Sequence, residues 1–366
     1  MEARRFIQIG TGGFGHYWCW EVLPRLIRAE KIEPAAAVDV VPGNLKHAMD
    51  GYGIPQERCF TNAQDAFRKV QADFAIIVVP PAHHEEMVDL AIGHGMDILS
   101  EKPIADTIEA CARIYQKVTK AGTKMAVTMS HRFDQDKQTL ERLIKSGKYG
   151  RLDYIVGRNT WTFRTYPSWG AFRYAIPDPL LIEAMVHHFD IMRALTGSDA
   201  RTVYAKTWRT AWDDFKGDCQ GLITVEMLNG NKVFYEGANA NASQLNAWSE
   251  DYWRAECEKA TLELDQRRIR SIMGGLGGDA CVQEIPLEKQ PTYQGRFYEA
   301  TPWMNPWLAE MFVDWLNGGP EPPNSLRDNI QCAALLFAAV ESAHTGQPVD
   351  VQAFLKRHLD ISCSCL

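Results

Sequence analysis

One lysine occupies a position that favours chemistry. Lys102 lies between Glu101 and Pro103, directly after the apolar stretch 97–100, which predicts a buried strand. A charged amine at the tip of a buried strand is costly to hold there unless the charge is used. It can donate hydrogen bonds to a reacting oxygen, or act as a base where its surroundings favour the neutral amine. The alternative is a surface lysine, or a simple ion pair between Lys102 and Glu101.

A second group of titratable residues lies in the segment Leu181–Arg193, whose sequence LIEAMVHHFDIMR predicts a helix. On a helix, Glu183, His187 and Asp190 share one face because they are spaced by four and three residues. A carboxylate four residues before a histidine can orient the ring and stabilise the imidazolium, which suits His187 to general base catalysis. His188 points about 100° away from His187. The alternative for both is a histidine satisfied inside a packed helix.

Residues 10–15 form a glycine-rich turn, Gly-Thr-Gly-Gly-Phe-Gly, between a predicted strand and a helical stretch that runs to about Arg28. This is the context that the dinucleotide-binding pattern G-x-G-x-x-G requires. The first glycine allows the tight turn, the second the approach of the pyrophosphate, and the third the packing of helix on strand. The residues predicted to surround the dinucleotide here are Gly10, Gly12, Gly13, Phe14 and Gly15.

Asp39 ends the second predicted strand. A carboxylate at this position accepts hydrogen bonds from the adenosine ribose hydroxyls and repels a 2′-phosphate. The residues that follow, Val40 and Val41, supply no arginine that could bind such a phosphate. We therefore expect Asp39 to bind NAD, with NADP the less favoured cofactor.

These candidates must be positioned by the repeated strand–helix pattern of residues 1–125, which predicts a doubly wound parallel sheet. Pro24 should kink the first helix or end it early. Ligands of such sheets bind beyond the carboxyl ends of the strands, so Gly10, Pro80 and Lys102 should converge on one crevice. The predicted strands are 5–9, 35–40, 74–79, 97–100 and 124–129, and the later helices are 83–95 and 107–121.

The pattern changes after about residue 130. Long strand-like segments there predict an α+β domain with a large, mainly antiparallel open sheet, and Asn229-Gly230 predicts a hairpin turn. We place the two domains at 1–125 and 126–366. The strands predicted in the second domain are 153–163, 202–210, 222–228, 232–235 and 261–264, and its helices are 137–146, 306–316 and 326–343.

Aromatic side chains crowd residues 161–174, just before the predicted His187 helix. Flat rings can pack on the C–H faces of sugars, while an arginine can bridge hydroxyls or bind a carboxylate. Trp161 and Phe163 alternate along a predicted strand and are expected in the core. Tyr166, Trp169 and Arg173 follow in a loop and are the predicted walls of a substrate pocket.

The composition is that of an ordinary globular protein, with 46% hydrophobic and 23% charged residues in a chain of 366. A net charge of -7 argues against a nucleic acid or an anionic membrane as partner. The longest apolar runs are far shorter than the roughly 20 residues that span a bilayer. Nine scattered cysteines and no visible secretory segment indicate a reducing cytoplasm. We interpret the terminal Cys363-x-Cys365 as a reduced tail and expect no metal site.

Several short stretches together resemble one known family. Besides the glycine turn and the Glu183…His187…Asp190 helix, they are Val-Val-Pro-Pro-Ala-His-His at 78–84, Ser-Glu-Lys-Pro at 100–103, His-Arg-Phe at 131–133 and the ending 339–346. Their order and spacing resemble the Gfo/Idh/MocA family of NAD(P)-dependent oxidoreductases, which includes glucose–fructose oxidoreductase and inositol dehydrogenase. The resemblance covers essentially the whole chain.

The resemblance implies an N-terminal Rossmann domain and a C-terminal domain whose open sheet forms the interface of a homo-oligomer, a dimer or a tetramer. It implies Lys102 in catalysis and His187 as the histidine of the family's D-x-x-x-H pattern. Glu183 stands where aspartate is commonest and Met185 where glycine often occurs, which puts the substrate in question. The expected cofactor contacts then add Val79, Pro80, His84, Glu101, Lys102 and Arg132, and the expected substrate contacts are Lys102, Tyr166, Trp169, Arg173, Glu183, His187 and His188.

The reaction expected from this set is the oxidation of a secondary alcohol on a sugar, glycoside or polyol, or the reverse reduction of a ketone. His187 would take the hydroxyl proton while Lys102 stabilises the developing alkoxide, or Lys102 would itself be the base. Two other functions fit the same resemblance. One is an NAD-using glycosidase that acts through transient oxidation, and the other is a non-catalytic regulator that senses a sugar or a dinucleotide.

Overall fold

The computed structural model describes residues 3–275, 279–288 and 303–363, with side chains described up to residue 360. The chain divides into two compact units, and each is assembled from separate stretches of sequence. The first unit comprises Met1–Phe133, Pro291–Ile330 and His358–Leu366, and the second comprises Asp134–Gln290 and Gln331–Arg357. The domain boundary at residue 125 stays a prediction. Later segments of the chain return to the first unit, which local sequence patterns do not encode.

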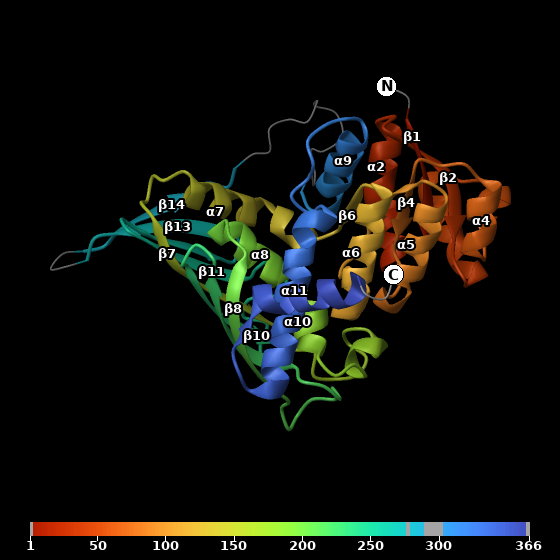
Figure 1. The fold of residues 1–366 in the computed structure, drawn as a ribbon. Helices are drawn as coiled ribbons and strands as arrows, with labels where there is room; N and C mark the ends of the chain where they lie inside the picture. The colour runs from red at the N-terminus through yellow and green to blue at the C-terminus, as the bar shows by residue number, and fades with distance from the viewer. Residues whose placement is uncertain (1–2, 276–278, 289–302, 364–366) are drawn as a thin grey trace. The chain divides into compact units, whose positions relative to one another are not determined.

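The first unit is built on a six-stranded sheet in the order β3-β2-β1-β4-β5-β6, in which all strand pairs are parallel (Figure 1). Its central strands are apolar and buried along most of their length, as expected of strands covered on both faces. The predicted doubly wound sheet is thereby confirmed. The strands are β1 (Arg4–Ile9), β2 (Ile32–Val38), β3 (Cys59–Phe60), β4 (Phe74–Ile77), β5 (Asp97–Ser100) and β6 (Met125–Val127).

The helices of this unit begin and end at recognisable caps. The side chain of Thr107 accepts a hydrogen bond from the backbone N–H of Ala110 at the start of α6, and Gly122 ends that helix with a left-handed φ of 67°. Asn62 caps α4 in the same way. The helices are α1 (Phe14–Tyr17), α2 (Leu23–Arg28), α3 (Lys46–Tyr52), α4 (Ala63–Lys69), α5 (His84–Gly93), α6 (Ile108–Ala121) and α9 (Asn305–Leu316).

The helix that follows the glycine turn does not end early at Pro24. It continues to Arg28, and the irregularity predicted there takes the form of a π segment, η1 (Trp18–Val22), between α1 and α2. Proline has no backbone N–H to donate, and a wider turn directly before Pro24 accommodates the missing bond. The π segment also carries Trp18, a wholly buried side chain that becomes important at the site.

Helix α9 lies late in the sequence but packs into the core of the first unit. Leu308, Phe312 and Val313 are buried in one cluster with Phe6 and Phe74 of the central strands. The rings of Phe74 and Phe312 lie 5.6 Å apart in an edge-to-face arrangement, which adds to the burial energy. The apolar face of the sheet is therefore completed by a segment more than two hundred residues downstream.

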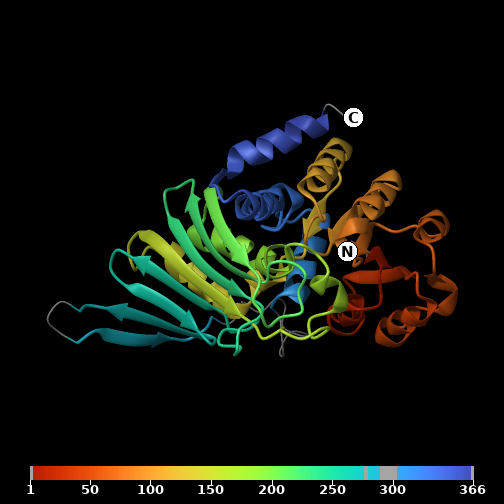
Figure 2. The same ribbon diagram turned by 90° about the horizontal axis from the view of Figure 1, so that it is seen from below.

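The second unit contains a nine-stranded sheet in the order β14-β13-β12-β11-β7-β10-β9-β8-β15 (Figure 2). All its pairs are antiparallel except β10 with β7, which confirms the predicted, mainly antiparallel sheet. The predicted turn at Asn229-Gly230 joins β9 to β10, with Gly230 at a φ of 91°. The strands are β7 (Leu152–Thr160), β8 (Ala200–Trp208), β9 (Gln220–Met227), β10 (Lys232–Ala238), β11 (Tyr252–Cys257), β12 (Thr261–Asp265), β13 (Arg268–Met273), β14 (Cys281–Ile285) and β15 (Val349–Asp350).

The two faces of this sheet differ. One is covered by helices: the Ser342 hydroxyl of α10, for example, accepts a hydrogen bond of 3.0 Å from the backbone N–H of Ala205 in β8. The other face exposes large apolar side chains, among them Tyr204, Leu222 and Phe234. The helices that lie wholly or partly in this unit are α7 (Gln135–Lys145), α8 (Val186–Thr196), α10 (Leu326–Thr345) and α11 (Val351–Cys363), with a π segment η7 (Leu180–Met185) before α8.

Within the described ranges, no helix is both long enough and apolar enough to cross a lipid bilayer. The cysteines of the same ranges up to Cys332 are free thiols. The C-x-C tail interpreted above lies outside the described residues, because Cys365 and the side chain of Cys363 are not among them.

Candidate active site

The glycine turn adopts the geometry that a dinucleotide needs. Gly10 has a left-handed φ of 90°, and a Cβ added there would lie 2.0 Å from the carbonyl oxygen of Val78. A Cβ on Gly15 would lie 2.4 Å from the carbonyl oxygen of Gly10, so only glycine lets the helix approach the strand. Gly13 has open space around it. The turn therefore fits a pyrophosphate at the start of α1.

Asp39 holds this turn in place. Its Oδ2 accepts hydrogen bonds of 2.9 Å from the backbone N–H groups of both Thr11 and Gly12. Its Oδ1 accepts from the backbone N–H of Val41 at 2.9 Å and from the Asn44 side-chain amide at 3.1 Å. The carboxylate thus ties the glycine turn to the loop after β2, in addition to the contact with ribose that its position predicts.

The electrostatics of Asp39 agree with this structural role. Burial alone would raise the pKa of its carboxyl group, but the hydrogen bonds from Thr11, Val41, Gly12 and Asn44 outweigh burial and lower the pKa. A carboxyl group whose folded pKa is depressed stabilises the protein above its unfolded pKa of about 3.8, and this contribution is lost as pH falls through the folded value. At neutral pH the Asp39 carboxyl group is ionised, so its hydrogen bonds to the glycine turn contribute their full stabilisation.

A prediction follows for Asp39→Ala. In many dinucleotide sites, removing the acid at this position would relieve repulsion of a 2′-phosphate, but here it also releases two backbone N–H groups of the glycine turn. We expect the Kd for NAD to rise by about tenfold or more, with no gain in affinity for NADP, since one hydrogen bond to a charged acceptor is worth about 1.5–3 kcal/mol. Fluorescence titration with both nucleotides measures this, and tighter NADP binding by the variant would contradict it.

Lys102 follows β5 at the carboxyl edge of the sheet, next to the turn after β4, as its sequence position predicts. The residue before it is fixed: the buried Glu101 accepts a hydrogen bond of 2.8 Å from the indole N–H of Trp18. Burial raises the pKa of Glu101, while hydrogen bonds from Thr128 and Trp18 and the charge of Lys102 act in the opposite direction. Because the charge of Lys102 acts on this carboxyl group, an ion pair between Lys102 and Glu101 stays the alternative to a catalytic role.

His84, predicted as a cofactor contact, is wholly buried. Its Nε2 lies 2.9 Å from the carbonyl oxygen of Val79, and its Nδ1 lies 3.0 Å and 3.2 Å from those of Pro103 and Ile104. The ring therefore contacts the backbone of the two loops that flank the sheet edge.

The remaining predicted cofactor residues are spread over the first unit. Phe14 is exposed and stacks on Tyr17, and Pro80 is exposed three residues after the end of β4. Arg132 is buried, where its guanidinium donates to the carbonyl oxygen of Pro323 at 3.1 Å and lies 3.7 Å from Asp328. Their contacts with a dinucleotide stay predictions.

The second unit carries the predicted substrate residues. Glu183 lies in the π segment η7 rather than in a regular helix, so its four-residue spacing from His187 does not stack the two side chains as an α-helix would. Its carboxylate accepts a hydrogen bond of 3.1 Å from Nε of Arg173. The Arg173 guanidinium is also sandwiched between the rings of Trp169 and Phe172, at 4.8 Å and 4.5 Å. Local sequence patterns do not predict the Arg173–Glu183 pair, because the two residues are joined by a loop whose shape no short pattern encodes.

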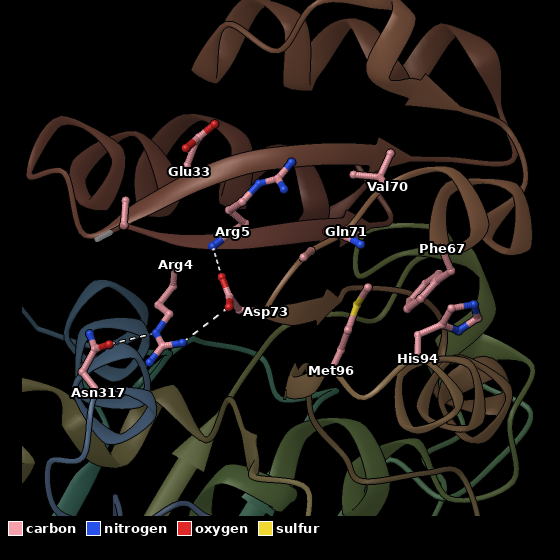
Figure 3. A pocket seen from close by; sticks show the side chains of 12 residues that line it. Arg4, Arg5, Glu33, Phe67, Val70, Gln71, Asp73, His94, Met96 and Asn317 are labelled. Atoms are coloured by element: carbon pink, nitrogen blue, oxygen red, sulfur yellow. Dashed lines mark hydrogen bonds and ion pairs between the residues drawn. The ribbon is translucent and has the colours of Figure 1, made fainter. Parts of the chain in front are cut away.

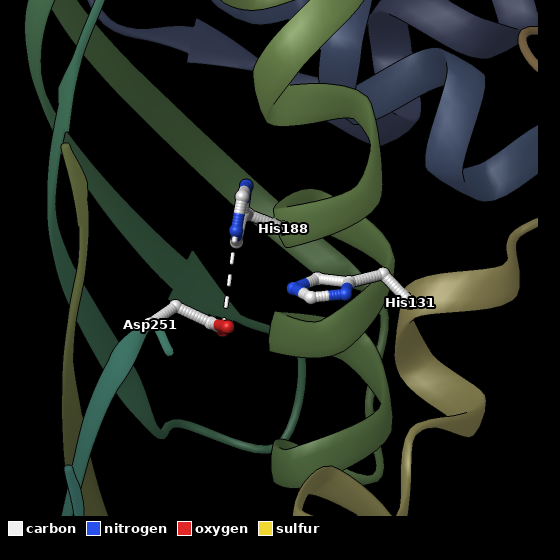
Figure 4. Close-up of side chains that lie close together, drawn as sticks. All are labelled: His131, His188 and Asp251. Carbon is white, nitrogen blue, oxygen red and sulfur yellow. Dashed lines mark ion pairs between the residues drawn. The ribbon is translucent and has the colours of Figure 1, made fainter. Parts of the chain in front are cut away.

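The two neighbouring histidines have different surroundings. The ring of His187 lies edge-on to Trp248, with ring centres 4.9 Å apart. His188 is buried against the rings of Tyr235 and Trp253, and its Nε2 lies 4.0 Å from Oδ2 of Asp251 (Figure 4). His188 thus points to the sheet side of the helix, consistent with the turn of about 100° that separates it from His187.

The aromatic residues before α8 form a continuous stack. Trp161 and Phe163 are stacked at 4.6 Å, and Phe163 and Trp169 at 5.2 Å. Trp169 therefore shares the stack of the two residues expected in the core, while Tyr166 is exposed and its backbone N–H donates to Asp214. The stack ends on the guanidinium of Arg173, which places the Arg173–Glu183 pair against a rigid apolar support.

A cavity of about 760 Å³ lies at the opposite edge of the first unit (Figure 3). It is located at the amino ends of the parallel strands, where Arg4 donates to Asn317 and lies 3.4 Å from Asp73. Ligands of open α/β sheets bind at the carboxyl ends. This cavity is therefore separate from the glycine turn and Lys102.

Comparison with known proteins supports the resemblance. Residues 4–129 match the GFO/IDH/MocA model described as the oxidoreductase family with an NAD-binding Rossmann fold, and residues 137–263 match the GFO/IDH/MocA C-terminal domain. An uncharacterised protein of Sinorhizobium fredii is 42% identical over 97% of both chains. A D-apiose dehydrogenase of Rhizobium rhizogenes is 25% identical over 88% of this chain and 91% of its own.

Solved structures agree on the fold. An oxidoreductase from Agrobacterium radiobacter, crystallised with NAD+, L-tartaric acid and magnesium, superimposes with a TM-score of 0.80. The match covers 96% of this chain and 99% of that one at 23% identity, so it speaks for the fold alone. Together with the matches over both domains, these findings show that the chain belongs to the Gfo/Idh/MocA family of oxidoreductases and that its N-terminal unit is an NAD-binding Rossmann fold.

Proposed function

We propose that this protein is an NAD-dependent dehydrogenase that oxidises a secondary alcohol of a sugar, glycoside or polyol, or reduces the corresponding ketone. The observation that carries the proposal is the placement of Lys102. It follows β5 at the same sheet edge as the glycine turn, next to a glutamate that the Trp18 indole holds. When bound, NAD supplies a hydride acceptor at its nicotinamide ring.

Two groups are proposed to act on the substrate oxygen: a hydrogen-bond donor and a base. The Lys102 ammonium donates a hydrogen bond to that oxygen and stabilises the charge that develops on it. A base takes the hydroxyl proton, and the ring of His187 or the amine of Lys102 can serve. The Glu183 side chain accepts a hydrogen bond from Arg173, and it is suited to accept further hydrogen bonds from substrate hydroxyls.

The substrate class rests on the second unit and on relatives. The Trp161–Phe163–Trp169 stack and the Arg173–Glu183 pair combine a flat apolar support with donors and acceptors, the combination that polyhydroxylated ligands require. A relative covering most of the chain is a D-apiose dehydrogenase. Tyr166 is exposed beside this stack and is a further candidate wall.

The experiment that tests the function is a screen of NADH absorbance over sugars, sugar acids, inositols and glycosides, in both directions. A dehydrogenase gives net NADH formation with at least one alcohol, or NADH consumption with a ketone. Release of free sugar from a glycoside without net NADH would indicate the glycosidase alternative. NAD binding without turnover on any compound would favour the regulator.

We also propose that the open face of the large sheet joins copies of this chain. Tyr204, Thr224 and Phe234 lie side by side across β8, β9 and β10, and the ring of Phe234 contacts Tyr154 of β7. Large exposed apolar side chains on a wide sheet face are typical of a protein interface.

Phe234→Lys should therefore convert an oligomer into monomers, because it places a charge in the centre of this face. Sedimentation velocity or light scattering measures the mass. Leu245→Lys is the matched control, since Leu245 is also exposed and apolar but lies outside the strands. An unchanged mass in the Phe234 variant would place the interface elsewhere.

A further inference from the structure

We propose that His84 is a positioning residue for Lys102 and that it acts by contacting the backbone of the loop after β4 and of the loop after β5. The proposal rests on the function proposed for Lys102. His84 is the first residue of α5 and is wholly buried, so it is closed off from solvent. A histidine buried this completely is held by specific partners.

Those partners lie on two different loops. The Nε2 atom faces the carbonyl oxygen of Val79, just after β4, at 2.9 Å. The Nδ1 atom faces the carbonyl oxygens of Pro103 and Ile104, just after Lys102, at 3.0 Å and 3.2 Å. Strands β4 and β5 are joined by a backbone hydrogen bond of 2.8 Å from Glu101 to Ile77. The imidazole ring continues this connection past the ends of the strands.

Lys102 is consequently held from both sides. The Trp18 indole binds the side chain of Glu101, the residue before it. The Nδ1 atom of His84 faces the carbonyl oxygens of Pro103 and Ile104, the two residues after it. A lysine side chain is long and flexible, and anchoring the backbone beneath it is an effective way to limit the positions its amine can reach.

The number of N–H groups on the His84 ring decides how it connects the two loops. A neutral imidazole has one N–H, whereas carbonyl oxygens face both of its nitrogens. Burial lowers the pKa of His84 by penalising the imidazolium, while Val79, Ile104 and Pro103 act in the opposite direction. One nitrogen of the neutral ring therefore donates a hydrogen bond to one loop, while the other nitrogen faces the opposite loop without a hydrogen bond, so the planar ring acts as a spacer between the two loops.

The test compares His84→Leu, which removes every donor, with His84→Asn, whose shorter amide is unable to span both loops. We expect kcat on a substrate found by the screen to fall at least tenfold, with KM and the Kd for NAD changing less than threefold, in either variant that folds. If His84 has a purely structural role, the variants lower the melting temperature, but kcat does not fall selectively while KM stays nearly constant. His94→Leu is the matched control, because His94 caps the other end of α5 and is exposed.

A second readout is independent of turnover. Competitive labelling of amines, followed by mass spectrometry, gives the reactivity of Lys102 relative to the exposed Lys120. The ratio should change at least threefold in the His84 variants and stay constant in the His94 control. Unchanged labelling and unchanged kcat in a folded His84 variant would overturn the proposal. Changed labelling in a protein without dehydrogenase activity would keep the bridge and refute the proposed reaction instead.

Discussion

Lys102→Met is expected to lower kcat by about 10³-fold, while the Kd for NAD stays within about threefold of the wild-type value. The substitution keeps an unbranched side chain, which is one atom shorter, and removes the donor proposed to contact the reacting oxygen. Loss of a positioned proton-transfer or oxyanion-stabilising group typically costs about 10²–10⁴-fold in rate. Steady-state kinetics on a substrate from the NADH screen, with NAD titration in parallel, measures both quantities.

The control for this variant is Lys120→Met, because Lys120 is an exposed lysine near the end of α6 in the same unit. It should leave kcat and NAD binding unchanged. A Lys102 variant that keeps more than a tenth of wild-type activity would remove Lys102 from the chemistry. Equal losses of activity and NAD affinity would instead assign it to cofactor binding.

The same assay decides which group takes the proton. If His187 is the base, His187→Asn abolishes the acidic limb of the pH profile of kcat/KM, and Lys102→Met leaves that limb in place. If Lys102 is the base, the limb persists in the His187 variant. The profile of kcat/KM reports groups of the free enzyme and substrate, so it is the quantity to follow.

The second large effect is expected in stability, from Lys137→Met. Lys137 is buried in the second unit, and its Nζ lies 2.7 Å from Asp251, 3.2 Å from Asp136 and 3.9 Å from Asp134. Burial alone would lower the pKa of Lys137, but the three carboxylates outweigh it and raise the pKa. Removing one partner from a buried charged group costs about 3–5 kcal/mol, because the remaining charges lose their compensation.

Chemical denaturation followed by circular dichroism measures this loss. Lys145→Met is the matched control, since Lys145 lies on the same helix α7 in an exposed pair with Glu141 and such pairs contribute about 0–1 kcal/mol. Lys137→Met combined with Asp251→Asn should recover part of the lost stability, because it removes a charge that the lysine compensated. A loss below about 1 kcal/mol in Lys137→Met would show that the cluster is compensated in another way.

This cluster also affects the candidate site. Asp251 accepts a hydrogen bond of 2.5 Å from the indole N–H of Trp253 and lies 4.0 Å from His188, the neighbour of His187 on α8. Lys137 therefore helps to fix the helix that carries the proposed base, although it is buried in a different helix.

Much of the fold follows from local sequence patterns. The glycine turn, Asp39 and the apolar strands are specified by residues close together in sequence, and the structure has them where the patterns predict. The strands β11 and β13 were not predicted, because charged residues such as Arg254 alternate with Trp253 and Ala255 and resemble a polar loop when counted without regard to face.

The parts of the site that sequence does not predict depend on contacts over long distances in the chain. Trp18 reaches Glu101 because a π segment places its side chain in the core. Arg173 meets Glu183 through a loop whose shape no short pattern encodes. Lys137 has the spacing of an ordinary helix residue, and its burial depends on Asp251, which is more than a hundred positions later.

The packing of α9 into the first unit bears on how the protein is made. The ribosome delivers the six parallel strands early, yet Leu308, Phe312 and Val313 complete the apolar cluster around Phe6 and Phe74. Until residues 305–316 have been synthesised, that surface of the nascent chain has no permanent cover. Biosynthesis proceeds at about 5–20 residues per second, so the exposed interval lasts on the order of ten seconds or more. During this interval the unfinished nucleotide-binding unit is the part of the nascent chain that a chaperone would be expected to protect.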